Sequence, residues 1–440
     1  MKTYKHLYES MLSPEMVAKC ALDAADGKIR RKEVISAFVH FDKTYDYVID
    51  CANNPDYVPC EDNTHEIIDG ANHKSREIEK PKFVPEQILH HMIVEPFKPV
   101  LMEGLYEQTY GCLPPTIKEG KDGKRYVKKY GPHAAIRQLV KWAQIGKKVY
   151  IAEADVKHAY GSVHIPTLVG QLRRVVKDKE WIRLTCQFLH YKEKDPGSAE
   201  MYGLILGHYT SPWFFNFYLK AFDHFAAKLQ GVKYLRFADN FYLVGTNKRK
   251  IHRALNAMRK YLKEKLRLTL NGSTQIYRFE YGTGKFDKKG KEITQGRQIN
   301  ALGAVIHFNR ETLRKSILMR MRRKAIRIGR KGTGTTWHDG SSMLARLAWV
   351  KCTDTHKYYE DHIKPLIHNK RLKAKVRLHS KAIQQIIKDR RRIIYAGLEA
   401  SSRLARSYAD RIRHDDQRGC CLPETQHQEN QVQRRGRKGT

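Results

Sequence analysis

Two short hydrophobic runs that each carry a single aspartate limit what this chain can fold into more than any other feature. The first run, residues 149–155, ends in Asp155, and the second, residues 234–244, holds Asp239 at its centre. A carboxylate in strand-like sequence is costly to bury unless it meets a cation. Two such strands side by side would form a site for divalent cations. The alternative is that both aspartates cap strand ends and lie in solvent.

A third segment, residues 203–223, lies between the two runs and predicts a glycine-containing loop that leads into a buried helix. Thr210 or Ser211 can cap the start of this helix, and Pro212 fits its first turn. The aromatic residues that follow would pack in a core without any ligand. Their order relative to the two aspartates is what adds functional information.

That order resembles the order of motifs in reverse transcriptases. Members of this family carry an aspartate strand with an aromatic residue five positions on, a loop that enters a helix, and a hairpin with an aspartate at its tip. The matching residues here are Asp155 and Tyr160, then Gly207, Ser211, Asn216, Tyr218 and Leu219, then Phe237, Ala238, Asp239 and Asn240. The resemblance covers roughly residues 70–365, including a fingers-like region upstream and a primer-grip-like strand at 299–305.

The resemblance implies an α+β fold of the right-hand polymerase type, with a ferredoxin-like antiparallel palm sheet and a helical thumb. The expected parts are an N-terminal helical extension (1–69), fingers (70–145), a palm (146–305) with a fingers insertion (165–200), a basic helical thumb (306–400) and a disordered basic tail (401–440).

The resemblance also implies RNA-directed DNA synthesis, a nucleotidyltransferase reaction assisted by two Mg²⁺ or Mn²⁺ ions. Asp155 and Asp239 would hold the ions with the carbonyl of Val156, and Asn240 would lie beside them in the catalytic hairpin. Tyr160, one helical turn beyond Asp155, would exclude the 2′-hydroxyl of a ribonucleotide. The residues expected around the dNTP are Tyr160, Leu206, Gly207, Ser211, Asn216, Arg76, Lys80 and Arg137.

Two positions depart from the family pattern. Asn240 replaces the second aspartate of the hairpin, which removes one negative charge but keeps an oxygen that can accept or coordinate. Ser273 stands where the family has a lysine that is assigned to protonation of pyrophosphate. The first departure leaves a second hypothesis open, namely a non-catalytic RNA-binding scaffold that kept the polymerase fold.

The loop from Leu206 to Ser211 bears on the branch of the family. It resembles most closely the loop of diversity-generating retroelement enzymes, which are error-prone opposite template adenine. Most reverse transcriptases have a glutamine where this chain has Leu206. Retron, group II intron-like and defence-associated reverse transcriptases remain alternatives.

The charge of the chain indicates a nucleic-acid partner. The formal net charge is +37 over 440 residues, which a polyanion would offset. Residues 310–331 are the most basic region, and apolar residues recur there at helical spacing, so one face can pack while the other meets phosphate. The residues expected to contact nucleic acid are Arg314, Lys315, Arg320, Arg322, Arg323, Lys324 and Arg327.

The expected partners are an RNA template, a DNA or RNA primer, dNTPs and a small basic accessory protein. No run approaches the roughly 18 apolar residues of a membrane span, and the first residues lack the apolar core of a signal peptide. The sequence therefore predicts a cytoplasmic protein with no membrane partner.

Overall fold

The N-terminal part of the protein is a small group of helices that packs against the rest of the chain. The computed structural model describes residues 2–60, 63–68, 75–119, 125–145, 148–193, 195–290 and 292–418. The N-terminal helices are α1 (Leu7–Met11), α2 (Pro14–Ala24), α3 (Lys32–Val39) and α4 (Phe41–Asn53). Apolar residues from all four join the largest hydrophobic cluster of the described residues, so this part is not an independent unit.

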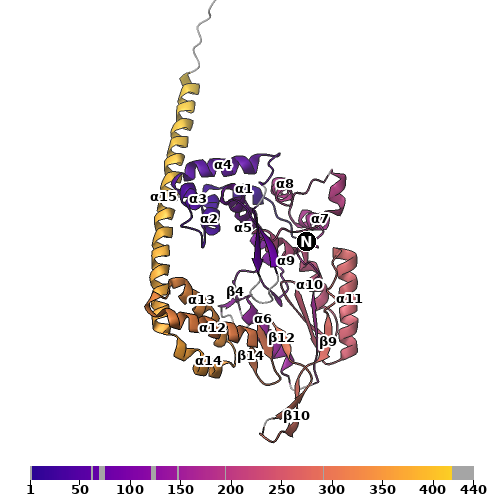
Figure 1. Ribbon diagram of the computed structural model, residues 1–440. Helices are drawn as coiled ribbons and strands as arrows, with labels where there is room; N and C mark the ends of the chain where they lie inside the picture. Colours follow the sequence, from indigo (N-terminus) through magenta and orange to yellow (C-terminus); the bar gives the residue numbers. More distant parts are fainter. Residues whose placement is uncertain are drawn as a thin grey trace, which may run out of the picture.

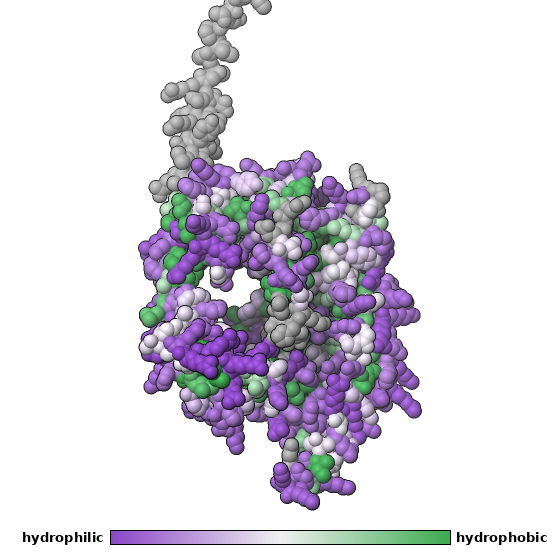
Figure 2. Space-filling model, viewed as in Figure 1, coloured by the Kyte–Doolittle hydropathy of each residue, from purple (hydrophilic) through white to green (hydrophobic). Residues whose placement is uncertain are grey.

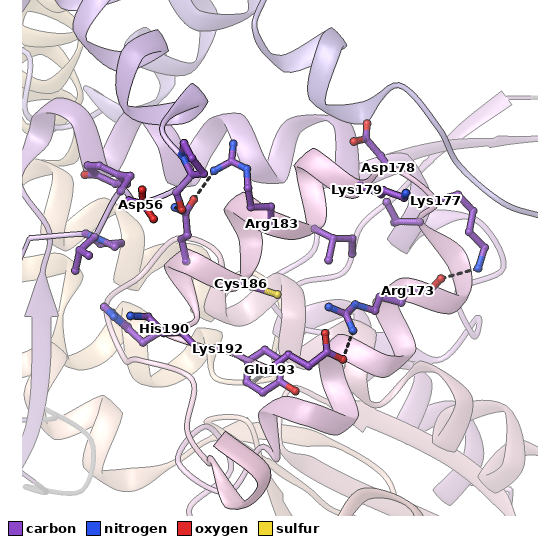
Figure 3. Close-up of a pocket in the computed structure, with 18 residues that line it drawn as sticks. Asp56, Arg173, Lys177, Asp178, Lys179, Arg183, Cys186, His190, Lys192 and Glu193 are labelled. Atoms are coloured by element: carbon purple, nitrogen blue, oxygen red, sulfur yellow. Dashed lines mark hydrogen bonds and ion pairs between the residues drawn. The ribbon is translucent and has the colours of Figure 1, made fainter. Parts of the chain in front are cut away.

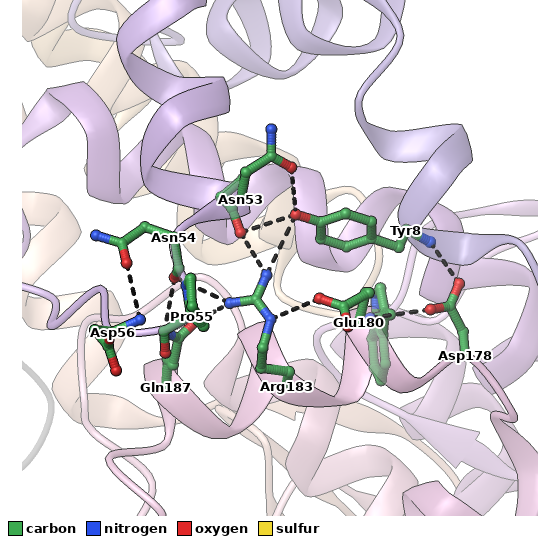
Figure 4. Close-up of polar contacts among 11 residues, drawn as sticks. Tyr8, Asn53, Asn54, Pro55, Asp56, Asp178, Glu180, Arg183 and Gln187 are labelled. Atoms are coloured by element: carbon green, nitrogen blue, oxygen red, sulfur yellow. Dashed lines mark hydrogen bonds and ion pairs between the residues drawn. The ribbon is translucent and has the colours of Figure 1, made fainter.

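Arg183 fixes the end of α4 to the body of the protein (Figure 4). It lies on α8 (Lys179–Phe188), and its guanidinium donates to the carbonyls of Ala52 at 2.6 Å and Asn54 at 3.1 Å. The hydroxyl of Tyr8 donates to the same Ala52 carbonyl at 2.8 Å. These donors satisfy carbonyls that the end of a helix leaves unpaired.

Two hairpins and a long helix follow the N-terminal helices. The elements are β1 (Asn63–Ile68), β2 (Ser75–Lys80), the short helical segment η1 (Phe83–Gln87), α5 (Ile88–Met102), β4 (Thr116–Glu119) and β5 (Arg125–Lys128). Strand β1 pairs with β2, and β4 pairs with β5, both antiparallel. Helix α5 contacts α2, α8 and α9 (Ser211–Tyr218), which places it in the middle of the upper half of the molecule (Figure 1).

A five-stranded sheet forms the centre of the fold. Its strands are β3 (Thr109–Tyr110), β7 (Lys233–Phe237), β8 (Asn240–Gly245), β6 (Tyr150–Asp155) and β9 (Gln275–Arg278), in that spatial order. All neighbouring pairs are antiparallel except β3 and β7, which are parallel. The expected antiparallel palm sheet is therefore present, with one parallel edge strand that the sequence did not predict.

Helices cover both faces of this sheet because side chains alternate along each strand. Ala152, Ala154 and Phe241 point to the face covered by α10 (Lys220–Ala227) and α11 (Lys248–Leu266). Ile151 and Tyr242 belong to the cluster on the other face, with α6 (Pro132–Ala143). The remaining helical elements of this half are α7 (Ile165–Val175) and η2 (Pro196–Glu200).

The C-terminal half leads from small sheets into helices. Strands β10 (Tyr281–Phe286) and β11 (Glu292–Gln295) form a projecting hairpin, and β12 (Ile299–Ala301), β13 (Ala304–Ile306) and β14 (Glu311–Leu313) form a three-stranded sheet (Figure 1). The helices that follow are α12 (Lys315–Lys331), η3 (Gly332–Gly334), α13 (Trp337–Val350), α14 (His356–His362), η4 (Lys364–Leu366) and α15 (Asn369–Arg418).

The α+β class and the right-hand arrangement are confirmed. A central sheet, hairpins and helices on one side of it, and a basic helical region after β14 surround an open space (Figure 1). Helix α15 continues to Arg418, past the predicted thumb boundary at residue 400. The predicted tail beyond residue 418 lies outside the described residues. Within the described part of the chain, no helix has the length and apolar character needed to cross a membrane.

Candidate active site

Asp155 and Asp239 lie at the same end of the central sheet. Strand β6 ends at Asp155, which pairs in register with Asn240, the first residue of β8. The backbone N–H of Val156 donates to the backbone carbonyl of Asp239 at 3.2 Å. The fold therefore joins two carboxylate-bearing segments that are far apart in the sequence.

The two carboxylates influence each other. Partial burial raises the pKa of Asp239, and the nearby negative charge of Asp155 also raises it. A backbone hydrogen bond, the positive charge of Arg76 and the amide of Asn240, which donates to Asp239 Oδ1 at 2.9 Å, act in the opposite direction. Hard oxygen donors that repel each other are the kind of ligand set that a divalent cation stabilises. The described ranges hold no group of three or more His, Cys, Asp or Glu side chains that suits a metal ion, and the two carboxylates here are a pair.

The turn that carries Asp239 has a strained backbone. Ala238 and Asp239 connect β7 to β8, and φ of Ala238 is +52°, a region that residues with a Cβ adopt at a cost. The Ala238 N–H donates to the Tyr110 carbonyl at 2.9 Å, and Arg236 donates to the Ala238 carbonyl at 2.9 Å. Gly111 has φ +92°, and a Cβ there would lie 2.9 Å from the Ala238 nitrogen. A glycine therefore allows the neighbouring segment to support this turn.

Two side chains from the turn after α11 hold the carboxylate of Asp155. Asn271 Nδ2 donates to Asp155 Oδ2 at 3.1 Å, and Ser273 Oγ donates to Asp155 Oδ1 at 3.0 Å. The backbone N–H of Asn271 also donates to the Asp155 carbonyl at 2.8 Å. In the sequence, Ser273 is distinguished only as the replacement of a lysine, and Asn271 is not distinguished at all. Polar residues in a loop are common, so these two give no local sign that they contact Asp155, which is far away in the sequence.

Tyr160 lies close to the turn that carries Asp239. Its ring stacks on Phe215 with a centroid distance of 5.0 Å. Burial raises the pKa of the Tyr160 phenol, with further contributions from Cys112 and Asp239, so the ring is within electrostatic reach of Asp239. The expected helical turn between Asp155 and Tyr160 is replaced by a series of turns in which His158 has φ +47°.

Comparison with known families agrees with this geometry. Residues 108–304 match the family model described as "Reverse transcriptase (RNA-dependent DNA polymerase)", and this range contains both aspartates and the supporting residues described above. Residues 108–304, which are less than half of the chain, are similar to this family and form what we call the reverse transcriptase domain. No curated protein sequence matches the chain. Among solved structures, it is similar to apo telomerase from Candida tropicalis truncated from its C-terminal domain, at 13% identity and a TM-score of 0.36, over 57% of this chain and 55% of that chain.

The three basic residues expected near the triphosphate occupy different places around the reverse transcriptase domain. Arg76, on β2, contributes to the electrostatic environment of Asp239. Lys80, at the end of β2, lines a separate cavity of about 500 Å³ together with Arg31. Arg137, on α6, affects the pKa values of Tyr110, His133 and Glu311, as expected for a position beside the three-stranded sheet. The structure thus brings only Arg76 of the three to the paired carboxylates.

Leu206 and Gly207 lie against strand β2. The Leu206 carbonyl accepts from the Glu79 N–H at 2.8 Å. Gly207 has φ +111°, and a Cβ there would lie 1.9 Å from the Glu79 carbonyl oxygen. The glycine therefore permits this loop of the reverse transcriptase domain to approach the β1–β2 hairpin.

Ser211 and Asn216 do not reach the open space as expected of nucleotide-binding residues. Their relative exposures are 3% and 2%. Ser211 Oγ donates to the Ile205 carbonyl at 2.6 Å, whereas Asn216 donates to the Gly111 carbonyl at 3.3 Å and accepts from Arg236 at 2.8 Å. Both side chains hold the loop and the turn that carries Asp239, and contact of these two residues with a dNTP stays a prediction.

The predicted nucleic-acid contacts divide into two groups. Arg314 donates to the carbonyl of Asn300 at 2.9 Å, and Lys324 forms an ion pair with Asp339 at 2.6 Å, so both have partners within the fold. The other predicted contacts lie on α12. Arg320 is half-exposed, and the exposed residues are Lys315, Arg322, Arg323 and Arg327. This second group is available to a phosphate backbone.

A cavity of about 870 Å³ between residues 55–59 and helices α7 and α8 lacks comparable chemistry (Figure 3). Its acidic residues are Asp56, Asp178 and Glu193. Glu193 is paired with Arg173 at 2.5 Å, and Asp178 accepts from the Trp181 N–H of α8 at 3.1 Å. Burial raises the pKa of the Cys186 thiol to about 11, so the thiol is protonated near neutral pH. The cavity is therefore a weaker candidate for catalysis than the paired aspartates.

Proposed function

We propose that this protein is an RNA-directed DNA polymerase that extends a primer on an RNA template with dNTPs. The observation that carries the proposal is the placement of Asp155 and Asp239 at one end of adjacent strands within the reverse transcriptase domain. Their oxygens, with the Val156 carbonyl, would hold two Mg²⁺ or Mn²⁺ ions. Such ions stabilise the attacking and leaving oxygens of a phosphoryl transfer.

The residues of the chain support this reaction by positioning and by charge. Asn271 and Ser273 orient the carboxylate of Asp155, and Arg236 holds the turn that presents Asp239. The positive charge of Arg76 near Asp239 would attract the triphosphate. The ring of Tyr160 would lie under the sugar, where its bulk excludes a 2′-hydroxyl.

A diversity-generating retroelement is our proposed setting for this activity, with a small basic accessory protein as partner and error-prone synthesis as the consequence. The support is the sequence of the Leu206–Ser211 loop, in which an apolar side chain stands before the glycine. Retron, group II intron-like and defence-associated settings are the alternatives. A cytoplasmic location remains a prediction.

A non-catalytic RNA-binding scaffold is the second candidate function. It is favoured by Asn240, whose amide donates a hydrogen bond to Asp239 where a second carboxylate would repel it. An uncharged amide that donates to this carboxylate would help to maintain the turn without a cation.

Primer extension by the purified protein separates the two candidates. With an RNA template, dNTPs and Mg²⁺ or Mn²⁺, the wild-type protein should extend the primer, and Asp239→Ala should abolish extension while RNA binding persists. Asp46→Ala, which removes an exposed carboxylate on α4, is the matched control and should extend normally. RNA binding without extension under either metal would support the scaffold and reject the polymerase.

A further inference from the structure

Helix α15 carries a row of basic side chains on the side that faces away from the rest of the protein. In Figure 1 the helix runs along one edge of the molecule, with the C-terminal helices and the N-terminal helices both on its inner side. It contacts α13 near its start and α2, α3 and α4 further along. The opposite side of the helix is therefore an outer surface of the protein, outside the open space.

The apolar residues of α15 fix which side of the helix is the inner one. Leu372 is buried in the cluster of the C-terminal helices, and Ile394 is buried in the cluster that includes the N-terminal helices. Ile383, Ile386 and Ile387 pack against that second cluster. Residues three, four or seven positions apart share one face of a helix, so these residues form a single apolar stripe. The helix uses this stripe for its contacts with both clusters.

The basic row lies on the face opposite the apolar stripe. Its members are all exposed, and each follows the previous one by four or seven positions. They are Lys370, Arg377, Lys381, Lys388 and Arg392. Lys370, Lys381 and Arg392 each precede a residue of the apolar stripe by two positions, which is about 200° around the helix axis. The row spans about 33 Å, because each of the 22 positions from residue 370 to residue 392 adds 1.5 Å.

The basic row contains no acidic side chain. Asp389 is the only acidic residue between positions 370 and 392, and it lies about 100° around the helix axis from Lys388. Its carboxylate accepts from the Gln385 amide at 2.9 Å. Within the part of the chain that the structure describes, none of the five basic residues has an ion-pair partner. Their like charges repel one another, and a polyanion laid along the row would offset that repulsion.

Helix α11 shows how the row on α15 differs from the generally basic surface of the protein. Hydrophilic side chains cover most of the face of the molecule in Figure 2, so composition alone does not select a binding surface. Helix α11 exposes Arg249, Arg253 and Lys260 on its outer face. That row is interrupted, because Glu264 is exposed one turn beyond Lys260 and Arg267 is already ion-paired. The uninterrupted row is on α15.

We propose that the outer row of α15 binds the phosphate backbone of an RNA duplex segment that lies outside the open space. The inference rests on the proposed function, because the segment belongs to the same RNA that serves as template. A helix that presents cations in line suits a regular RNA duplex, which proteins recognise by its shape and its phosphates. A membrane surface suits the row less, because a helix that lies on a membrane needs a free apolar face, and the apolar stripe of α15 is buried in the protein.

Binding of two related RNA ligands tests the proposal without any nucleotide. One ligand is a short RNA–DNA template–primer, and the other is the same template–primer with an RNA hairpin added to either end of the template strand. The wild-type protein should bind a hairpin-extended ligand about tenfold more tightly or better, because it adds several phosphate contacts. The triple variant Arg377→Gln, Lys381→Gln, Lys388→Gln should lose this gain and keep its affinity for the short template–primer. Its salt dependence on the extended ligand, as log K against log salt, should be shallower by about 3, which is about 1 for each lost phosphate contact.

Helix α11 supplies the matched control. Arg249→Gln, Arg253→Gln, Lys260→Gln removes the same net charge from another exposed helix face and should keep the gain from the hairpin. Glutamine is a good helix former, so both triple variants should fold.

Three results would overturn the proposal: no gain for the wild-type protein with the hairpin at either end, an equal loss of gain in the two triple variants, or an equal loss of affinity for both ligands in the α15 variant. Binding to phosphatidylserine vesicles that the α15 variant loses, without any gain from the hairpin, would assign the row to a membrane surface instead. A gain from the hairpin without primer extension would reject only the polymerase, and primer extension without the gain would reject only the role of α15.

Discussion

Arg236 and Asp223 form a fully buried ion pair directly behind the turn that carries Asp239. Both side chains have zero exposure, and the shortest distance between them is 2.7 Å. Asp223 also accepts hydrogen bonds from Thr109 at 3.0 Å and Tyr234 at 2.8 Å. The guanidinium of Arg236 uses its remaining donors on Asn216 and on the Ala238 carbonyl. The ion pair therefore sets the position of this turn.

Removal of one partner separates the structural role of this pair from its role in the reaction. Arg236→Met leaves a buried carboxylate unpaired and should lower the free energy of unfolding by about 3–5 kcal/mol. Arg236→Met combined with Asp223→Leu should regain most of that stability, because the unpaired charge is gone. Despite its regained stability, the double variant should extend primers more slowly than the wild-type protein, because the Ala238 carbonyl has lost its hydrogen-bond donor. Denaturant unfolding and primer extension measure the two effects, and a double variant with the wild-type rate would contradict the positioning role.

The sequence indicated the main strands of the site but not the contacts that support them. The run that ends in Asp155 forms β6, and the residues around Asp239 form a hairpin, because alternating apolar residues set strand position locally. Ser211 and Asn216 have side chains that suit either a nucleotide or a buried hydrogen bond, and the sequence does not distinguish these environments. The packing of the long helix α15 against the N-terminal helices was also not predicted, because this contact joins segments at opposite ends of the chain.

Asn271 and Ser273 should affect the reaction through Asp155. The double variant Asn271→Ala, Ser273→Ala should reduce the rate of primer extension by about 10–100-fold, the usual cost of losing the groups that orient a metal ligand. It should also require more Mg²⁺ for half-maximal rate. Ser273→Thr keeps a hydroxyl at the same position and should restore most of the loss attributable to Ser273→Ala. Unchanged Mg²⁺ dependence in the double variant would mean that these contacts only stabilise the loop.

Tyr160 should control the choice between dNTPs and NTPs. Tyr160→Ala removes the ring that stacks on Phe215 and opens the space beneath the sugar. Discrimination against an added hydroxyl by a closed apolar pocket is about 100-fold, so the variant should lose a factor of that order. Tyr160→Phe keeps the bulk of the ring and should keep the discrimination. The measurement is the ratio of kcat/KM for a dNTP to kcat/KM for the matching NTP. The same ratio in the wild-type protein, Tyr160→Ala and Tyr160→Phe would show that Tyr160 has only a packing role.

His91 should make the stability of the protein sensitive to mild acid. Burial lowers the pKa of His91 to about 4, with further contributions from Lys98 and Lys28 and an opposing one from Glu95. In the unfolded state the pKa of His91 is near 6.5, so as the pH falls this side chain takes up a proton in the unfolded state before it does so in the folded state. The stability that neutral His91 contributes is therefore complete above pH 6.5 and is lost between pH 6.5 and 4.

His91→Phe keeps an aromatic ring against Tyr209, on which His91 stacks at 3.7 Å, and removes the titrating group. The melting temperature of this variant should fall less between pH 7 and pH 5 than that of the wild-type protein. His91→Gln, which also lacks the titration but loses the stacking, should show the same flatter pH dependence at a lower absolute melting temperature. Parallel pH profiles for wild type and His91→Phe would exclude His91 as the source.

Leu206 should determine the fidelity of synthesis. Its carbonyl is bonded to Glu79 of β2, so the loop position is set by the backbone and the side chain can be exchanged with little change in the fold. A leucine side chain offers no hydrogen bond to a nascent base pair. Apolar contact alone discriminates between close analogues by about 1–3 kcal/mol, so misincorporation should be high.

Leu206→Gln should reduce errors, most of all opposite template adenine, whereas Leu206→Met keeps the apolar character and should not. The measurement is the sequencing of cDNA that the wild-type protein and these two variants copy from one adenine-rich RNA. Identical error spectra would show that Leu206 only fills space, and they would leave the polymerase proposal intact.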